Sequence, residues 1–442
     1  MTQEPKGSVS LPAKSSGQCT AWFLLVCEIA LQKTMIRVPA LLVLLAFVMA
    51  TPTADARKNN REKASQALHH TSQDGQVEAR LIAIYKLVGL AKTREALPLA
   101  ERLVRDHPNF QLAQLLYGDL LTAQLRPIRN LGDVPDTTAK LATPQLLELR
   151  KESQLRLQAL RERPAAGLIP SQFVALSARN KHAIAVDAAK SRLYLFENSG
   201  SGMKLLGDYY ISVGKSGTEK AVEGDLRTPL GVYFVTSNLD PKSLKDFYGS
   251  GALPINYPNM LDVKRGKTGS GIWLHGTPPD QFSRAPLATD GCVVLANPDL
   301  ERIIRTVEVR TTPVVIAQNL KWVAPMTAQA DGKSFEDALV AWSNAKSSGD
   351  MTRLMSWYTP DFTSYGKNLG DYAPAMQQEL KQLAGRAVQL KDVSYLRWTD
   401  ASDTMVVTFG ELAQGAKTGQ TKRQYWIRQS GQWKIFFEGT VG

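Results

Sequence analysis

Two short stretches of the sequence, Leu274-His275-Gly276 and Thr289-Asp290-Gly291-Cys292, give the strongest indication of a fold and a chemistry. His275 precedes Cys292 by 17 residues, and a loop separates the two stretches. A cysteine attacks as the thiolate, so it needs a base or an electric field that lowers its pKa from about 8.5. We therefore predict that Cys292 is a nucleophile with a lowered pKa and that His275 is its general base.

Gly291 stands directly before the candidate nucleophile, where a residue without a side chain lets the backbone turn tightly. The amides of Gly291 and Cys292 are then predicted to form an oxyanion hole, in which each donor contributes about 3–4 kcal/mol. The alternative is an inert buried cysteine and a core histidine. The ordered spacing of the two stretches favours the catalytic interpretation.

The surrounding residues, 171–322, alternate short apolar segments with glycine-rich turns. This pattern is typical of a mainly-β sandwich or barrel-like domain with few helices. His275 is expected at the end of one strand. The predicted strands cover residues 183–187, 191–196, 205–213, 228–235, 271–275 and 313–317.

Residues 182–320 resemble the YkuD family, the L,D-transpeptidase catalytic domain, in which a strand ends in His-Gly and a loop leads to Ser/Thr-x-Gly-Cys. The segment Arg227-Thr228-Pro229-Leu230-Gly231 is similar to the Thr-Pro-x-Gly segment of that family, and Asn297 follows shortly after Cys292. The resemblance implies that a peptidoglycan stem peptide acylates Cys292 and that the acyl group passes to an amine.

Two departures from the family pattern bear on substrate binding: Asp290 replaces a histidine and Val294 replaces an arginine. Arg284, in the loop between His275 and Cys292, is predicted to supply the missing charge, because a guanidinium matches the carboxylate of a diaminopimelate-containing stem. A solvated loop arginine is the alternative. Asp290 is expected either to orient His275 or to cap the loop. The predicted substrate-binding set is Arg284, Thr289, Asp290 and Gly276.

The first 56 residues are predicted to be absent from the mature protein. A basic start at Met35, an apolar segment Val38–Ala50 and the small-x-small pattern Ala54-Asp55-Ala56 are typical of a secretory signal peptide. We expect residues 1–56 to combine a spurious N-terminal extension with a signal peptide that begins at Met35, and we expect a periplasmic protein. The alternative is an uncleaved anchor in the inner membrane, facing the periplasm.

Composition narrows the choice of partners. The chain is 43% hydrophobic and 21% charged, as in packed globular domains, and its net charge of +12 favours acidic surroundings or simply a solvated cationic surface. No Lys/Arg run interleaved with aromatic residues indicates nucleic acid, and no Cys/His cluster indicates a metal. No cofactor is predicted. Cys19 and Cys27 precede the predicted cleavage site, so no disulfide is expected within the mature chain.

Residues 57–165 are predicted to form a helical region that resembles tetratricopeptide repeats, with a plain helical hairpin as the alternative. Helices are expected over 79–88, 93–106 and 145–163, and a turn-rich segment over 125–144. The residues at the small and closing positions of a repeat are Ala96, Ala100, Leu103 and Pro108.

Residues 327–442 are predicted to form an α+β domain that resembles the NTF2-like fold. This resemblance implies a cone-shaped pocket that binds a ligand or mediates packing, and we expect an accessory, non-catalytic role. A helical stop is expected at Tyr358-Thr359-Pro360. The predicted helices cover 335–347, 350–357 and 376–383, and the predicted strands cover 388–398, 405–412, 422–428 and 433–438.

The three regions together predict an exported peptidoglycan L,D-transpeptidase with a helical N-terminal region, a mainly-β catalytic domain and an NTF2-like domain. One alternative is an L,D-carboxypeptidase that trims tetrapeptide stems, because a YkuD-type domain joined to an NTF2-like domain resembles cell-shape-determining carboxypeptidases. Another is a non-catalytic wall-binding scaffold. Peptidoglycan stem peptides are the expected substrates, and envelope proteins are expected partners of the helical region or the NTF2-like domain.

Overall fold

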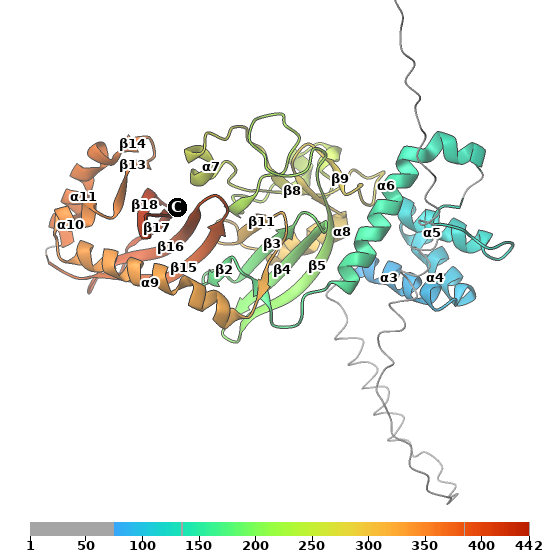
Figure 1. Ribbon diagram of the computed structural model, residues 1–442, viewed down its shortest axis with the longest axis horizontal. Coiled ribbons are helices and arrows are strands. Elements are labelled where there is room, and N and C mark those ends of the chain that lie inside the picture. Colours follow the sequence, from blue (N-terminus) through green and yellow to red (C-terminus); the bar gives the residue numbers. More distant parts are fainter. Residues whose placement is uncertain (1–74, 134–135, 384, 442) are drawn as a thin grey trace, which may run out of the picture. The chain divides into compact units, whose positions relative to one another are not determined.

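The computed structural model describes residues 75–133, 136–383 and 385–441 (Figure 1). The predicted signal peptide and its start at Met35 lie outside these residues. The described chain divides into two compact units, one with residues 79–150 and the other with residues 75–78 and 151–441. Within the described ranges, no helix has both the length and the apolar character needed to cross a membrane.

The N-terminal helices agree with the predicted periodicity. They are α3 (Gln76–Gly89), α4 (Thr93–Asp106) and α5 (Gln111–Thr122). In α4 the buried residues Ala96, Ala100 and Leu103 form one face, as expected for an amphipathic helix. The resemblance to tetratricopeptide repeats stays a prediction.

The turn-rich segment predicted for residues 125–144 is wrong in its second half. Helix α6 spans Asp136–Arg161 and runs through Pro144. A proline inside a helix has no N–H to donate, and its ring crowds the preceding turn, so it usually destabilises the helix. Helix α6 nevertheless continues past Pro144.

The catalytic region contains a nine-stranded sheet in the order β6-β11-β3-β4-β5-β10-β8-β7, with β9 paired to β5. Its strands are β3 (His182–Asp187), β4 (Arg192–Ser199), β5 (Gly202–Gly214), β6 (Gly231–Phe234), β7 (Ala252–Pro254), β8 (Trp273–His275), β9 (Leu287–Thr289), β10 (Val293–Leu295) and β11 (Pro313–Ala317). The helices α7 (Met260–Lys264) and α8 (Asn297–Thr306) accompany it. The predicted mainly-β character is confirmed.

Both faces of this sheet are buried. Along β3, Ile184 and Val186 belong to one hydrophobic cluster, which also contains Leu300 of α8. Ala183 and Ala185 belong to a second cluster, which extends to side chains of the C-terminal domain. This alternation follows from the two-residue period of a strand.

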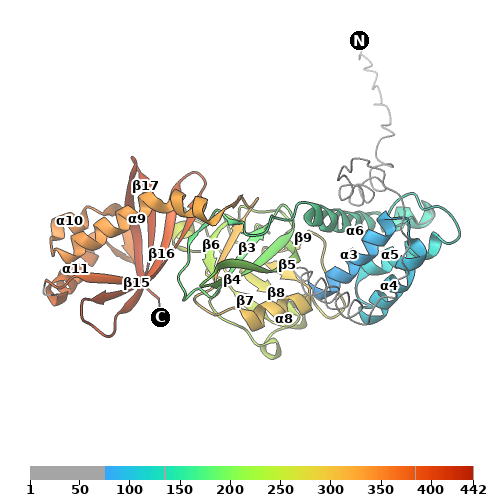
Figure 2. The same cartoon turned by 90° about the horizontal axis from the view of Figure 1, so that it is seen from below.

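The C-terminal region is an α+β domain, as predicted. Its helices are α9 (Pro325–Ser347), α10 (Met351–Met355) and α11 (Leu369–Leu383). Its strands are β13 (Tyr358–Ser364), β14 (Lys367–Asn368), β15 (Val388–Thr399), β16 (Asp403–Ala413), β17 (Gln420–Gln429) and β18 (Gln432–Thr440). They pair in the order β14-β13-β18-β17-β16-β15. Helix α9 lies along the curved sheet in both views (Figures 1 and 2).

Two details of this domain differ from the prediction. Residues 358–360 begin strand β13, which pairs in parallel with β18, rather than ending a helix. Strand β2 (Phe173–Ala175), predicted within the catalytic segment, adds to the edge of the C-terminal sheet by pairing with β15. Such pairing between distant segments leaves no local signal in the sequence.

The aromatic core of this domain gives a stability prediction. The ring of Phe335, fully buried on α9, contacts those of Tyr395, Trp426 and Trp433 at centroid distances of 5.3–5.5 Å. Phe335→Ala should lower the free energy of unfolding of this domain by about 3–5 kcal/mol, because it leaves a cavity in a packed core. Urea unfolding followed by tryptophan fluorescence measures the change. Val340→Ala, on the same helix but 55% exposed, is the control and should cost far less.

Candidate functional site

Parallel pairing of β8 with β10 brings the two predicted catalytic residues together. Leu274 pairs with Val293, and His275 pairs with Val294. Leu274 and Val293 both face the hydrophobic cluster of the sheet, so His275 and Val294 point to the opposite face. Cys292 directly precedes β10, and its Sγ lies 3.5 Å from the carbonyl of Gly271, just before β8. The pairing therefore places Cys292 near the beginning of β8 and His275 at the end of that strand.

His275 is held as a neutral base. Its Nδ1 lies 2.8 Å from the carbonyl oxygen of Gly276. A carbonyl only accepts, so Nδ1 carries the proton and Nε2 keeps its lone pair. Burial lowers the pKa of His275 to about 4; the Gly276 carbonyl opposes the shift, and the charge of Arg284 adds to it. The imidazole is therefore uncharged at neutral pH, with its one proton on Nδ1.

Aromatic side chains surround His275, and the sequence analysis did not identify two of them. Tyr248 and Phe247, on the 3-10 turn Asp246–Tyr248, lie 5.1 Å and 5.8 Å from the imidazole, centroid to centroid. Tyr248 also stacks on Trp273 at 4.8 Å, and its carbonyl accepts from the Gly276 amide at 3.0 Å. These rings exclude water around the base, which contributes to its low pKa.

Gly276, predicted to bind substrate, has a packing role. A side chain at this position would place its Cβ 2.0 Å from Oδ1 of Asn297. That oxygen accepts from the amides of Ser250 and Thr277, and the Asn297 side-chain amide donates to the Thr277 carbonyl at 2.9 Å. Asn297 thus fixes the chain directly after His275.

The loop before the nucleophile is shaped by Thr289. This residue is buried, and its hydroxyl accepts from the Gly291 amide at 3.1 Å and donates to the Cys292 carbonyl at 2.7 Å. Gly291 has a φ of +128°, and a Cβ there would lie 2.7 Å from the carbonyl oxygen of Arg227. Since the Gly291 N–H already donates to Thr289, only the Cys292 amide of the predicted pair stays a candidate oxyanion donor.

Cys292 is a half-buried thiol and not a preformed thiolate. Burial raises its pKa, whereas the charges of Arg284 and Lys220 lower it less strongly. Its Sγ donates a weak hydrogen bond to the Gly271 carbonyl at 3.5 Å. The predicted lowering of its pKa is therefore wrong for this state, because the desolvation of a buried thiolate outweighs the nearby positive charge.

Arg284 lies beside both catalytic candidates, since its charge influences the pKa of His275 and of Cys292. Its guanidinium carbon stacks 4.5 Å from the centroid of the Phe247 ring. Burial lowers its own pKa, and its Nε has no hydrogen-bond partner among the described residues. The side chain is therefore a partly desolvated cation beside the catalytic pair.

Asp290 does not orient His275. Its carboxylate forms an exposed ion pair with Lys215 at 2.9 Å, and the Nδ1 of His275 is already bonded to the Gly276 carbonyl. Its negative charge raises the pKa of Cys292 slightly, after the larger effect of burial.

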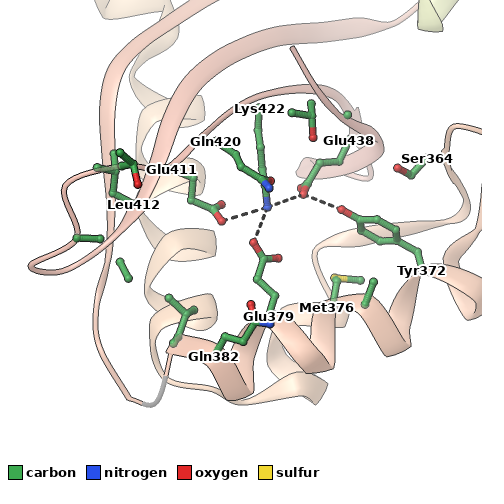
Figure 3. Close-up of a pocket in the computed structure, with 18 of the residues that line it drawn as sticks. Ser364, Tyr372, Met376, Glu379, Gln382, Glu411, Leu412, Gln420, Lys422 and Glu438 are labelled. Carbon is green, nitrogen blue, oxygen red and sulfur yellow. Dashed lines mark hydrogen bonds and ion pairs between the residues drawn. The ribbon is translucent and has the colours of Figure 1, made fainter. Parts of the chain in front are cut away.

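A separate cavity of about 650 Å³ lies in the C-terminal domain (Figure 3). Lys422 contacts the carboxylates of Glu379, Glu411 and Glu438 at 2.8, 3.1 and 3.3 Å, and Tyr372 donates to Glu438 at 3.0 Å. The described residues that line this cavity include no cysteine or histidine, and the accessory role of the domain stays a prediction. Within the described ranges, no group of three or more His, Cys, Asp or Glu side chains could hold a metal ion.

Comparison with known families identifies both domains. Residues 181–316 match the YkuD L,D-transpeptidase catalytic domain, and residues 334–439 match the Cds6 C-terminal NTF2-like domain. The chain therefore contains an L,D-transpeptidase catalytic domain followed by an NTF2-like domain of the Cds6 type. No curated protein matches the chain.

Two solved structures are similar to parts of this chain. The Bd1075 protein of Bdellovibrio bacteriovorus superimposes with a TM-score of 0.53 at 24% identity, over 62% of this chain and 98% of that one. The helical cell shape determining protein Pgp2 of Campylobacter jejuni gives a TM-score of 0.47 at 21% identity, over 66% of this chain and 99% of that one. The similarity to the Bd1075 structure supports the fold described above.

The protonation state of the catalytic pair predicts a particular pH dependence. Because burial raises the pKa of Cys292, the rate of its alkylation by iodoacetamide should still be rising at pH 9, without a plateau near neutrality. Intact mass measured against time at each pH gives the rate. A plateau below pH 8 would show that a thiolate is preformed and would contradict this description.

Proposed function

We propose that this protein is an exported peptidoglycan L,D-transpeptidase in which a stem peptide acylates Cys292. The observation that carries the proposal is the neutral imidazole of His275, with its Nε2 unprotonated, at the end of the strand that pairs in parallel with the strand directly after Cys292. A neutral thiol beside a neutral imidazole suits general-base activation during attack. The family of the catalytic domain supports peptidoglycan as the substrate and the cell envelope as the location.

In the first half-reaction, Nε2 of His275 takes the thiol proton as Sγ of Cys292 attacks the carbonyl carbon on the L-configured side of the scissile amide. The Cys292 amide donates to the oxyanion. The C–N bond then breaks, and the imidazolium gives its proton to the leaving amine. A thioester on Cys292 results.

In the second half-reaction, the amine of another stem gives a proton to His275 as it attacks the thioester, and the C–S bond breaks to restore the thiol. Water in place of the amine would yield the trimmed stem of an L,D-carboxypeptidase through the same residues. The two activities differ in acceptor access, so the products must distinguish them.

Arg284 is proposed to bind a substrate carboxylate. A free carboxylate is costly to bury without a partner, and Arg284 is a partly desolvated cation that influences both catalytic side chains. Stacking on Phe247 holds the guanidinium plane and leaves its N–H groups free for bidentate binding. Val294, buried on β10, carries no charge that could replace it.

The decisive experiment is mass spectrometry of muropeptides after incubation with the purified protein. Cross-linked dimers with loss of the terminal residue indicate transpeptidation, and tripeptides from tetrapeptides indicate carboxypeptidase activity. A scaffold would leave the muropeptides unchanged and would need no acylated thiol. Cell fractionation tests export. A cleaved protein should be found in the periplasmic fraction, and an anchored protein should be found in the inner-membrane fraction.

Loss of either catalytic side chain should abolish or strongly reduce turnover. Cys292→Ala should form no acyl-enzyme, because the described chain contains no other cysteine. His275→Ala should lower kcat by roughly 10²–10⁴-fold, the usual contribution of general acid–base catalysis. Muropeptide analysis and circular dichroism of each variant test this expectation. Full activity of folded Cys292→Ala protein would refute the cysteine mechanism.

Arg284→Ala should reduce kcat/KM for a diaminopimelate-containing tetrapeptide by about 1.5–3 kcal/mol, the range for a hydrogen bond to a charged group. Arg284→Lys should restore only part of the loss, because an ammonium cannot reproduce the bidentate contact. Arg305→Ala is the control, since Arg305 is exposed on α8 and pairs only weakly with Glu301 at 3.5 Å. An Arg284→Ala variant with wild-type kcat/KM would place the carboxylate elsewhere.

A further inference from the structure

A buried ion cluster connects helix α6 to the catalytic sheet. Its members are less than 5% exposed and come from helices α3 and α6 and strands β4 and β5. They are Glu78, Glu152, Arg156, Arg192 and Asp208. The three carboxylates and two guanidinium groups lie within the second unit of the chain.

Each charge in the cluster is paired. Arg156 donates to Glu78 at 2.8 Å and to Glu152 at 2.7 and 2.9 Å. Arg192 donates to Glu78 at 2.9 Å and to Asp208 at 2.5 Å. Burial alone would raise the pKa of Glu78, but the two arginines lower it to about 2. Burial raises the pKa of Glu152 and that of Asp208, and Oδ2 of Asp208 has no hydrogen-bond partner among the described residues. The directed hydrogen bonds of the two arginines nevertheless make the side chains of the cluster hard to move.

Two contacts join this cluster to the loop that carries Arg284. The hydroxyl of Ser283 donates to Glu152 at 2.9 Å. The guanidinium of Arg156 stacks 3.9 Å from the ring centroid of Tyr210, and the Tyr210 hydroxyl donates to the Arg284 carbonyl at 3.0 Å. Ser283 therefore contacts Glu152 of α6 directly, and the Arg284 backbone is linked to Arg156 of α6 through Tyr210.

Strand β5 holds the remainder of the loop. The Ser212 hydroxyl donates to the Ala285 carbonyl at 2.5 Å, and the Val213 amide donates to the Pro286 carbonyl at 2.9 Å. Strand β9 then pairs with β5. In the segment 283–286, the Ser283 side chain contacts Glu152 of α6, and the Arg284 side chain contacts Phe247 of the 3-10 turn.

We propose that Glu152 of α6 is a positioning residue that sets the place of the Arg284 guanidinium through Ser283. This inference rests on the proposed function, in which Arg284 binds a substrate carboxylate. Helix α6 then belongs to the functional site although it precedes the matched catalytic segment 181–316. The helix controls substrate affinity, whereas the chemistry at Cys292 is independent of it.

The test is Ser283→Ala, which removes one hydrogen bond and leaves the ion cluster intact. KM for a diaminopimelate-containing tetrapeptide should rise about three- to tenfold, the effect of one such bond. The value of kcat should be unchanged, because Ser283→Ala removes no group that takes part in the chemistry. Ser201→Ala, in the exposed hairpin between β4 and β5, is the matched control and should behave as wild type. Glu152→Ala, which removes the acceptor of the Ser283 hydroxyl, should raise KM similarly, and if it does not fold, Ser283→Ala decides.

A double-mutant cycle separates positioning from a general structural effect. In the Arg284→Ala background, Ser283→Ala should cause no further rise in KM, because the group that it positions is gone. A wild-type KM for Ser283→Ala, or the same fold-change in both backgrounds, overturns the inference while the proposed function stands. If the wild-type protein neither forms an acyl-enzyme nor turns over the tetrapeptide, the proposed function fails and this inference fails with it.

Discussion

The parallel pairing of β8 with β10 is the constraint on which the candidate site depends. Parallel neighbours cannot be joined by a tight turn, so the chain must travel from Gly276 back to Cys292 through a long connection. Asn297 fixes the beginning of that connection, β5 holds its later part, and Thr289 shapes its end. The residues around the two motifs serve to close this loop in one conformation.

The same packing sets the protonation states of the pair. Burial lowers the pKa of His275 and raises that of Cys292, so both shifts favour the uncharged forms. An imidazolium at His275 and a thiolate at Cys292 would both lose their hydration in this buried environment, which is costly. The burial therefore favours transfer of the thiol proton during attack over a thiolate that exists beforehand. A carboxylate bound at Arg284 would offset the positive charge that influences the pKa values of His275 and Cys292.

The sequence predicted those features that have a local signal. The bounds of α4 and β11 follow from periodicity and proline placement, and the spacing of His275 and Cys292 singled out the two residues that flank the pairing of β8 with β10. The pKa of Cys292 could not be predicted, because it depends on burial by distant segments. The motif included Thr289 as a predicted substrate-binding residue, but it could not show that the hydroxyl bonds within the loop, to the Gly291 amide and the Cys292 carbonyl.

The buried ion cluster is the clearest case of a feature without a sequence signal. Glu78 and Arg192 are 114 residues apart, and neither lies near a catalytic motif. Replacing such a cluster with apolar side chains often costs nothing in stability, so stability alone does not explain five buried charges. Directed hydrogen bonds have another property: they fix a single arrangement of the groups that they join. Here that arrangement ends at Ser283 and at the backbone of Arg284, the residue whose guanidinium is proposed to bind a substrate carboxylate.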